Sequence, residues 1–282
     1  MKLVFKNFDF DLSKKPLVMG ILNITPDSFS DGGLYLNLDN ALAHTDKMIK
    51  DGANMIDIGG ESTRPGADPL NPDEESRRIV PVIEAITKRF PSVPISVDTY
   101  KSIVAQRTIE AGAAIINDVY GLRYNEDMAE IIAKHNIPVV IMHMKGTPAN
   151  MQLDTHYDNL IEDILNFFKE RIAFAVKSGI KKEMIIIDPG IGFGKTIDHN
   201  LEILDNLPKF KELNCPILMG TSRKFFIGTI LGDVPITERL IGSAATAVIS
   251  VYNGASIIRA HDVKETLDAV KIAYAVKYGY KN

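Results

Sequence analysis

Residues 17–33 read LVMGILNITPDSFSDGG, an apolar run that stops at an asparagine and continues into a loop rich in polar residues and glycine. The run at residues 17–23 does not alternate apolar and polar side chains. An unbroken run of this length is typical of a strand that is buried on both faces. Such strands occur mainly in parallel sheets covered by helices. The stretch therefore predicts a parallel sheet if the rest of the chain repeats it.

The same pattern recurs along the whole chain. Further runs of strand length lie at residues 53–59, 94–98, 113–118, 138–143, 184–189, 216–221 and 255–260. Segments with helical periodicity separate the runs, and several of them end in glycine just before the next strand. Eight strand–helix units in 282 residues predict one α/β domain over residues 1–282, a single (β/α)8 TIM barrel. A doubly wound open sheet is the alternative.

The composition is that of an ordinary soluble protein, with 45% hydrophobic and 24% charged residues and a net charge of −4. A mildly acidic chain has no overall attraction to nucleic acid or to membrane surfaces. No uncharged apolar run is long enough to span a bilayer. The single cysteine, Cys215, cannot form an internal disulfide, and the charged N-terminus does not resemble a secretory signal. We therefore expect a cytoplasmic protein without nucleic-acid or membrane partners.

Polar side chains end most of the predicted strands. In chain order they are Asn23, Asp57, Asp98, Asn117, Asp118, His143, Asp188, Ser222 to Lys224, Arg259 and His261. In a TIM barrel these positions share one rim, the C-terminal end where active sites lie. Helix caps and turns account for one or two such residues, but they account poorly for a full ring. The pattern predicts a functional site on this rim.

The segment GIGFGKT at residues 190–196 resembles a phosphate-binding loop but fits neither standard pattern. A Walker loop has four residues before its Gly-Lys pair, and the dinucleotide pattern has a final glycine where Lys195 stands. We expect these glycines to let backbone and ligand approach closely beside Asp188. No histidine has a zinc-ligand partner at the usual spacing, and no nucleophile elbow is present.

The motifs together resemble the dihydropteroate synthase family from about residue 17 to residue 265. They are GILNITPDSFSDGG, IDIGGESTRPGA, ISVDT, INDVYG, MHMKGTPANMQ, DPGIGFGKT, GTSRK and IIRAHDV. The resemblance implies a pterin-binding barrel that joins (7,8-dihydropterin-6-yl)methyl diphosphate to 4-aminobenzoate, with Mg²⁺ as cofactor. Its products are 7,8-dihydropteroate and diphosphate, on the route to folate. It also implies a homodimer and a target of sulfonamides, which mimic 4-aminobenzoate.

The family resemblance implies a site residue by residue. It places Asp98, Asn117, Asp188 and Lys224 around the pterin, and the acceptors and donors of these side chains suit the edge of that ring. Met142 and Phe193 are expected to form apolar walls. The diphosphate is expected at Arg259 and His261, together with Thr63, Arg64 and Asn23, and Asn23 is the expected Mg²⁺ ligand. The 4-aminobenzoate ring is expected near Thr63, Pro65, Phe193, Lys224 and Phe29, with its carboxylate near Ser222.

The expected chemistry needs no strong nucleophile or base. We expect a dissociative substitution in which Mg²⁺, Arg259 and His261 stabilise the departing diphosphate, and loops carrying Asn23 and Arg64 exclude water. The catalytic set on this hypothesis is Asn23, Arg64, Asp98, Asp188, Lys224, Arg259 and His261. Phe225 and Ala260 depart from the family pattern, which leaves sulfonamide sensitivity open.

Two other functions remain possible from the sequence. A pterin-dependent methyltransferase barrel shares the pterin-binding residues, but it does not need the STRPG, SRK and RAHD motifs. A non-catalytic pterin-binding paralogue would bind the pterin without turnover. Because Asn23, Arg64, Lys224, Arg259 and His261 are all present, the sequence favours the synthase over both.

Overall fold

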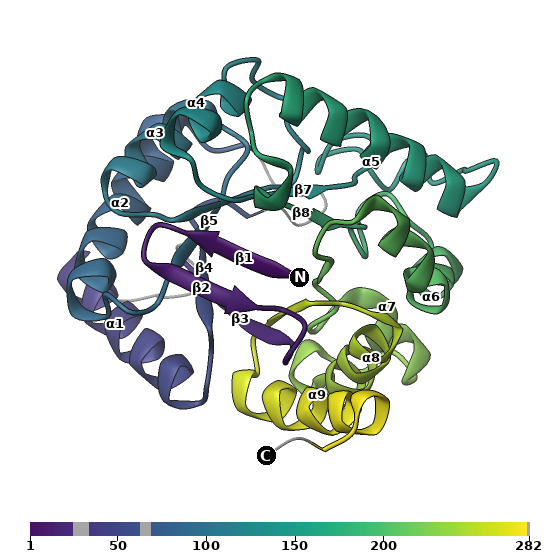
Figure 1. Ribbon diagram of the computed structural model, residues 1–282. Coiled ribbons are helices and arrows are strands. Elements are labelled where there is room, and N and C mark those ends of the chain that lie inside the picture. Colours follow the sequence, from purple (N-terminus) through teal and green to yellow (C-terminus); the bar gives the residue numbers. More distant parts are fainter. Residues whose placement is uncertain (25–33, 63–68, 281–282) are drawn as a thin grey trace.

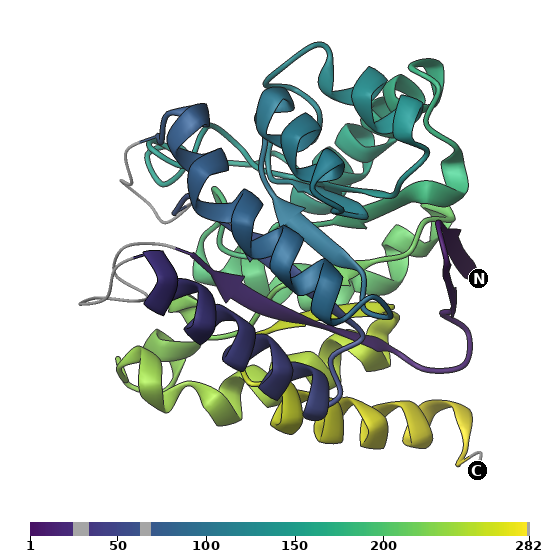
Figure 2. The ribbon, with the colours of Figure 1, turned by 90° about the vertical axis from the view of Figure 1, so that its left-hand side faces the viewer.

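The computed structural model describes residues 1–24, 34–62 and 69–280. Within them, eight parallel strands surround a common centre and helices lie outside the strands (Figures 1 and 2). The strands are β3 (Leu17–Asn23), β4 (Met55–Gly59), β5 (Ile95–Asp98), β6 (Ile115–Asp118), β7 (Val139–Met142), β8 (Ile185–Asp188), β9 (Leu218–Met219) and β10 (Ile257–Ala260). Each overlaps one of the predicted runs, so the predicted parallel strands are confirmed.

The sheet order shows that the strands form a barrel. Neighbouring strands follow the order β8-β7-β6-β5-β4-β3-β10-β9, so β3 pairs in parallel with both β4 and β10. The two ends of this order, β8 and β9, meet at a bridge between Ile187 and Ile217. There the Ile187 N–H donates to the Pro216 carbonyl at 3.0 Å. The nearly closed barrel confirms the predicted fold and excludes the open sheet.

Strand β9 is shorter than the run at residues 216–221 predicted. Pro216 has no N–H to donate to a ladder, and its carbonyl instead accepts the bond from Ile187. Beyond Met219 the chain leaves the ladder, and Gly220 and Ser222 line the cleft described below. The shortening thus turns the end of the predicted strand into part of the rim.

The helices of the described residues pack around the strands. They are α1 (Leu34–Lys50), α2 (Pro72–Arg89), α3 (Ser102–Glu110), α4 (Met128–His135), α5 (Leu160–Lys177), α6 (Ile197–Asn206), α7 (Phe225–Ile230), α8 (Leu240–Asn253) and α9 (Val263–Tyr278). Their ends follow local chemistry. Helix α2 has a proline in its first turn and is capped by Asn71, whose side chain accepts from the Asp73 N–H at 2.8 Å. Helix α8 ends at Gly254, whose φ is 113°.

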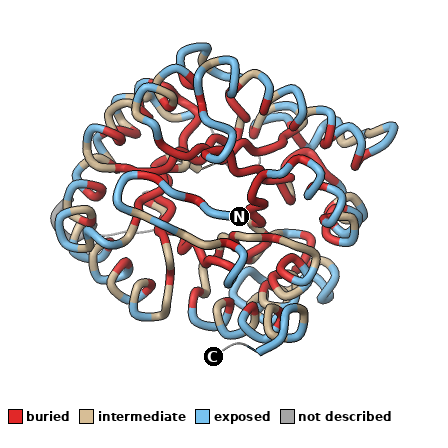
Figure 3. The backbone as a smooth tube through the Cα atoms, viewed as in Figure 1, coloured by how far each residue is buried: buried red, intermediate tan, exposed pale blue. Residues whose placement is uncertain are grey.

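The core lies inside the ring of strands and between the strands and the helices. Met19, Ile56, Val97 and Ile116, from four successive strands, have no exposed surface, and Figure 3 shows buried segments gathered around the centre of the molecule with exposed segments mostly at its periphery. Burying one such side chain contributes about 1.5–3 kcal/mol to folding. Burial on both faces is the physical reason why these strands do not alternate apolar and polar residues.

An N-terminal hairpin covers the end of the barrel opposite the site. Strands β1 (Lys2–Phe5) and β2 (Phe8–Asp11) pair antiparallel across the end at which the barrel strands begin (Figures 1 and 2). Leu3 and Phe5 are buried, and the Lys6 ammonium donates to the Ala113 carbonyl just before β6 at 2.7 Å. The sequence did not predict this hairpin. No helix among the described residues is long and apolar enough to cross a membrane.

Candidate active site

The polar ends of the strands converge on a cavity at the C-terminal rim. It contains about 420 Å³ of empty space, part of it open to solvent, and is lined by Asp98, Asn117, Val119, Met142, Asp188, Gly190, Ile191, Phe193, Gly220, Lys224 and Arg259. Every residue predicted for the pterin pocket is in this lining, and these residues come from five different strands or the loops that follow them. Carboxylates, an amide and two cations therefore face one small apolar-walled space.

A buried ion cluster organises this cavity. The Arg259 side chain donates through Nε to Asp57 Oδ2 at 2.6 Å and through Nη2 to Asp98 Oδ2 at 3.0 Å. Asn117 Nδ2 donates to the same oxygen of Asp57 at 3.1 Å. Asp57 has no exposed surface, and its carboxylate orients the side chains of Arg259 and Asn117, which line the cavity. Asp57 belongs to the predicted ring of strand ends but not to the predicted site residues.

Burial shifts the protonation of the cavity carboxyls. It raises the pKa of Asp98 to about 7, against the opposing effect of Arg259 and with a smaller upward contribution from Asp57. Burial also raises the pKa of Asp188, although the Gly190 N–H donates to Asp188 Oδ1 at 2.8 Å. Asp98 Oδ1 is buried and has no hydrogen-bond partner in the described structure. A buried acceptor without a partner is costly, and a ligand N–H would satisfy it.

A larger cleft of about 1750 Å³, part of it open to solvent, adjoins the cavity. Phe193, Gly220, Lys224 and Arg259 line both spaces. The Lys224 ammonium lies 4.2 Å from the centroid of the Phe193 ring, a cation–π distance. Burial, followed by the charge of Arg259, lowers the pKa of Lys224 to about 8. These four residues, called the shared wall below, border both spaces, so a molecule in one space lies next to a molecule in the other.

His261 and Ser222 lie together in the cleft. The Ser222 hydroxyl lies 3.0 Å from His261 Nδ1 and accepts from the His261 backbone N–H at 3.1 Å. Burial, reinforced by the positive charge of Arg259, lowers the pKa of His261 to about 3. His261 is therefore neutral at pH 7 in the ligand-free protein. In that form its imidazole can offer a hydrogen bond but carries no positive charge.

Asn23 lies at the end of β3 and lines the same cleft as Arg259 and His261. Its side-chain amide makes no hydrogen bond within the described part of the chain. An amide oxygen free to bind, near cationic groups suited to phosphate, fits a Mg²⁺ ion held mainly by substrate oxygens and water. Among the described residues there is no group of three or more acidic, histidine or cysteine side chains for a metal held by protein alone. The remaining predicted residues, Phe29, Thr63, Arg64 and Pro65, lie outside the described residues.

The glycines of the segment 190–194 allow backbone conformations and close contacts that a side chain would prevent. Gly190, Gly192 and Gly194 have φ values of 72°, 82° and 65°, a region that side chains rarely adopt. A Cβ on Gly190 would lie 2.0 Å from the His143 carbonyl oxygen, and one on Gly194 would lie 2.7 Å from the Lys145 carbonyl oxygen. At Gly190 and Gly194 the backbone thus lies close to the chain that follows β7. At Gly192 the atoms nearest to a Cβ belong to the Lys224 side chain.

Two members of the strand-end ring have structural roles in this state. The Asp118 carboxylate accepts from the backbone N–H groups of Tyr120 and Leu122, each at 2.8 Å, and so shapes the turn after β6. Burial raises the pKa of Asp118 to about 6. His143 contacts the ammonium of Lys195 instead of facing the cavity. The ring therefore contains both site residues and residues that hold the rim in shape.

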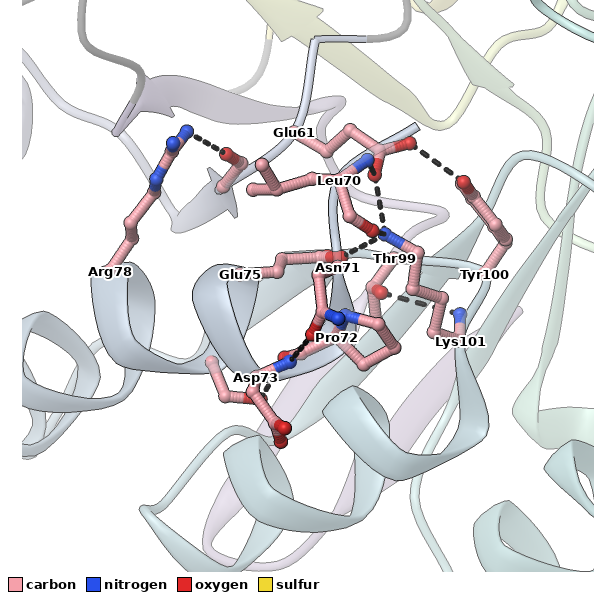
Figure 4. A network of polar contacts seen from close by, with 12 residues as sticks. Glu61, Leu70, Asn71, Pro72, Asp73, Glu75, Arg78, Thr99, Tyr100 and Lys101 are labelled. Carbon is pink, nitrogen blue, oxygen red and sulfur yellow. Dashed lines mark hydrogen bonds and ion pairs between the residues drawn. The ribbon is translucent and has the colours of Figure 1, made fainter. Parts of the chain in front are cut away.

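A second buried ion cluster, which the sequence did not reveal, lies beside the rim (Figure 4). The Lys101 ammonium bonds the carboxylates of Glu61 and Glu75, the latter at 2.6 Å, and donates to the Leu70 carbonyl at 2.7 Å. Glu61 also accepts from the Tyr100 hydroxyl and from the Leu70 N–H, each at 2.7 Å. The cluster fixes Glu61 and Leu70 against the chain that follows Asp98.

Comparisons with known proteins agree with this geometry. The family model described as pterin binding enzyme matches residues 19–261. The dihydropteroate synthase of Clostridium beijerinckii is 49% identical over 265 residues, which cover 94% of this chain and 95% of that protein. The chain belongs to the dihydropteroate synthase family. It is therefore related throughout its length to transferases, and its resemblance to the family is confirmed.

Solved structures of this family extend the comparison. The Yersinia pestis dihydropteroate synthase, solved as a sulfonamide drug complex, superposes with a TM-score of 0.92 at 48% identity and covers 98% of this chain and 99% of that one. The Xanthomonas albilineans enzyme, solved with 7,8-dihydropteroate, gives a TM-score of 0.87 at 38% identity and covers 99% of both chains. The family assignment supports the synthase rather than the methyltransferase barrel or the non-catalytic paralogue.

Proposed function

We propose that this chain joins (7,8-dihydropterin-6-yl)methyl diphosphate to 4-aminobenzoate, with release of diphosphate and formation of 7,8-dihydropteroate. The observation that carries the proposal is the shared wall of Phe193, Gly220, Lys224 and Arg259 between a small polar cavity and a larger cleft. A two-substrate condensation needs two adjoining spaces whose occupants meet at one point. The polar cavity suits the pterin, and the cleft suits the aminobenzoate and the diphosphate.

The pterin is recognised by hydrogen bonds to polar groups of the cavity that have no partner in the described part of the ligand-free protein. Asp98 Oδ1 has no partner among the described residues, so it accepts from an N–H group along the pterin edge. Asp188 and Asn117 add an acceptor and an amide that can both accept and donate. Met142 provides an apolar wall. Because an ionised Asp98 is the better acceptor, pterin binding lowers its pKa from the raised value of the free protein.

The diphosphate binds at the cationic side of the cleft. Arg259 is held by Asp57 and Asp98 in a fixed orientation, so its remaining N–H groups are aimed before the substrate arrives. His261 donates a hydrogen bond through its imidazole, while Thr63 and Arg64 complete the set by family resemblance. Asn23 would hold Mg²⁺ through its amide oxygen. When bound, the ion neutralises charge on the diphosphate and makes it a better leaving group.

The 4-aminobenzoate binds against Phe193 and Lys224, with its carboxylate directed toward Ser222. Phe29, Thr63 and Pro65 are assigned to this slot by family resemblance. The C–O bond to diphosphate breaks first, and its electron pair leaves with the diphosphate. The amine lone pair then forms the new C–N bond, and the amine loses one proton to solvent. We propose a dissociative course in which Asp98 and Asp188 favour the positive charge that develops on the dihydropterin.

The family also suggests a homodimer. Exposed apolar side chains gather on α8 and α9, two helices packed against each other, where Ile241, Ile272 and Val276 are 81%, 67% and 71% exposed. An apolar face of this kind is typical of protein interfaces. Light scattering coupled to size-exclusion chromatography tests this point. We also propose that the protein is cytoplasmic and binds sulfonamides, and titration of the protein with a sulfonamide tests the second point.

The decisive experiment measures diphosphate release from the pterin diphosphate by the purified chain with Mg²⁺, in the presence and absence of 4-aminobenzoate. Release that depends on the aminobenzoate, with an equal amount of dihydropteroate formed, supports the proposal. Tight pterin binding without product refutes it and favours the paralogue. Addition of EDTA is expected to abolish release, and excess Mg²⁺ is expected to restore it.

A further inference from the structure

Lys195 is a buried cation for which the proposed function has no role. The residue is 3% exposed, and a buried charge is costly unless hydrogen bonds compensate for it. Its Nζ donates to the Phe193 carbonyl at 3.0 Å and to the His143 carbonyl at 3.4 Å, and it lies 3.0 Å from His143 Nδ1. Three acceptors from two separate loops therefore meet at one ammonium group.

The backbone around Lys195 explains why a cation is needed there. The segment after β8 folds back on itself, and the Phe193 N–H donates to the Gly190 carbonyl at 3.1 Å. This turn packs directly on the chain that follows β7, since a Cβ on Gly190 would lie 2.0 Å from the His143 carbonyl oxygen. The carbonyls of His143 and Phe193 are thus brought together away from solvent, where each needs a donor.

We propose that Lys195 is a positioning residue that fixes the Phe193 ring in the shared wall by tying the Phe193 carbonyl to His143. The inference rests on the proposed function, in which that ring contacts the 4-aminobenzoate. Through its ring Phe193 also contacts the Lys224 ammonium at 4.2 Å. Displacement of the Phe193 backbone would therefore move the aromatic surface and the cation of the aminobenzoate slot together.

The bonds of Lys195 do not depend on one protonation state. Burial lowers the pKa of Lys195 to about 7, against the attraction of Asp188. The ammonium has three N–H donors and the neutral amine has two, so both states can donate to the two carbonyls. Burial also keeps the pKa of His143 well below its ordinary value, which leaves this imidazole neutral and able to accept at one ring nitrogen.

Other side chains hold the rest of the segment, so removal of the Lys195 ammonium has a local effect. Asn200 Oδ1 accepts from the Gly192 N–H at 2.7 Å, and Gln152 Nε2 donates to the Gly192 carbonyl at 3.1 Å. The Tyr157 hydroxyl donates to the Gly194 carbonyl at 3.0 Å. Among the described side chains, Lys195 is the one that bonds the carbonyl of Phe193.

The test compares Lys195→Met, which keeps the length of the side chain without its N–H donors, with Lys145→Met. Lys145 is a nearby lysine whose ammonium pairs with exposed Asp154, donates to the His156 carbonyl and lies 5.1 Å from the centroid of the Tyr157 ring, but makes no bond to the segment 190–194. Lys195→Met is expected to raise the KM for 4-aminobenzoate about tenfold, the scale of one lost bond to a charged donor. Its kcat should stay within about twofold of wild type, and because the Phe193 ring also borders the pterin cavity, its dissociation constant for free pterin should rise by no more than about threefold. Lys145→Met should leave all three constants unchanged.

A second variant guards against a folding defect. Lys195→Gln keeps an N–H donor, so its KM for 4-aminobenzoate should lie between those of wild type and Lys195→Met. An equal loss of pterin affinity in Lys195→Met, an unchanged KM for aminobenzoate, or loss of cooperative unfolding in both variants would overturn the proposal. Failure of the proposed function is distinguishable from all of these, because the wild-type protein itself would then form no dihydropteroate.

Discussion

Replacement of Asp57 by asparagine removes one negative charge from the ion cluster that holds Arg259, with almost no change in side-chain volume. Asp57 Oδ2 accepts from Arg259 Nε at 2.6 Å and from Asn117 Nδ2 at 3.1 Å. An asparagine can keep both bonds through its amide oxygen, because they share one atom. It carries no charge, however, and it places an amide NH2 group where buried Asp57 Oδ1 has no partner among the described residues. Arg259 retains Asp98 as a partner at 3.0 Å, so the guanidinium stays paired but is less firmly oriented.

The size of the effect follows from the contacts that remain. A hydrogen bond to a charged group contributes about 1.5–3 kcal/mol. Loss of one partner of a buried ion pair costs about 3–5 kcal/mol when the other charge is left alone, which is not the case here. We therefore expect kcat/KM for the pterin diphosphate to fall about 10- to 100-fold, because a mobile Arg259 stabilises the departing diphosphate less well.

Steady-state kinetics with each substrate varied in turn measures this effect, and urea denaturation shows whether the variant is folded. The KM for 4-aminobenzoate should change by less than about threefold, because Asp57 contacts neither Phe193 nor Lys224. Wild-type kinetics with the pterin diphosphate in a folded Asp57→Asn protein would refute the reasoning. It would mean that Asp98 alone orients Arg259.

Three further predictions concern the same rim. Burial raises the pKa of Asp98 to about 7, and the bound pterin favours the ionised carboxylate, so the pterin affinity measured by calorimetry should rise from pH 5.5 to 7 and level off above. Asp98→Asn should bind pterin weakly at every pH. A flat profile for the wild-type protein would count against the assignment of Asp98 to the pterin pocket. Arg259→Ala should weaken binding of the pterin diphosphate more than binding of free pterin. An equal loss of affinity for both ligands would show that Arg259 is not part of the phosphate site. Lys101→Met leaves two buried glutamates without their cation and should lower the free energy of unfolding in urea by about 3–5 kcal/mol. Lys264→Met removes an exposed ion pair and should have little effect on that free energy. Similar stability of the two variants would contradict the stabilising role of the cluster around Lys101.

Much of the fold could be predicted because the barrel strands carry a local signal. Burial on both faces requires unbroken apolar runs, and those runs are visible in the sequence. The hairpin of β1 and β2 has no such signal. Its strands are only four residues long, and while β2 alternates apolar with charged side chains, β1 does not. Its stability therefore comes from packing against the barrel end rather than from its own pattern.

The site could be predicted as a ring of strand ends but not as a network. Asp57 and Arg259 are 202 residues apart in the chain, and nothing near either residue indicates that they pair. His143 and Asp118 occupy equivalent rim positions, yet they bond Lys195 and local backbone. Which strand-end side chain turns toward the cavity depends on three-dimensional packing, which the sequence pattern does not contain.

The wall shared by Phe193, Gly220, Lys224 and Arg259 has a thermodynamic consequence. A ligand in either space restricts the motion of the same side chains, so the second ligand loses less conformational entropy when it binds. The two affinities are then linked, and linkage requires that each ligand strengthens the other by the same factor. A single molecule long enough to occupy both spaces would order these side chains once, and it would bind more tightly than the sum of its separate halves suggests.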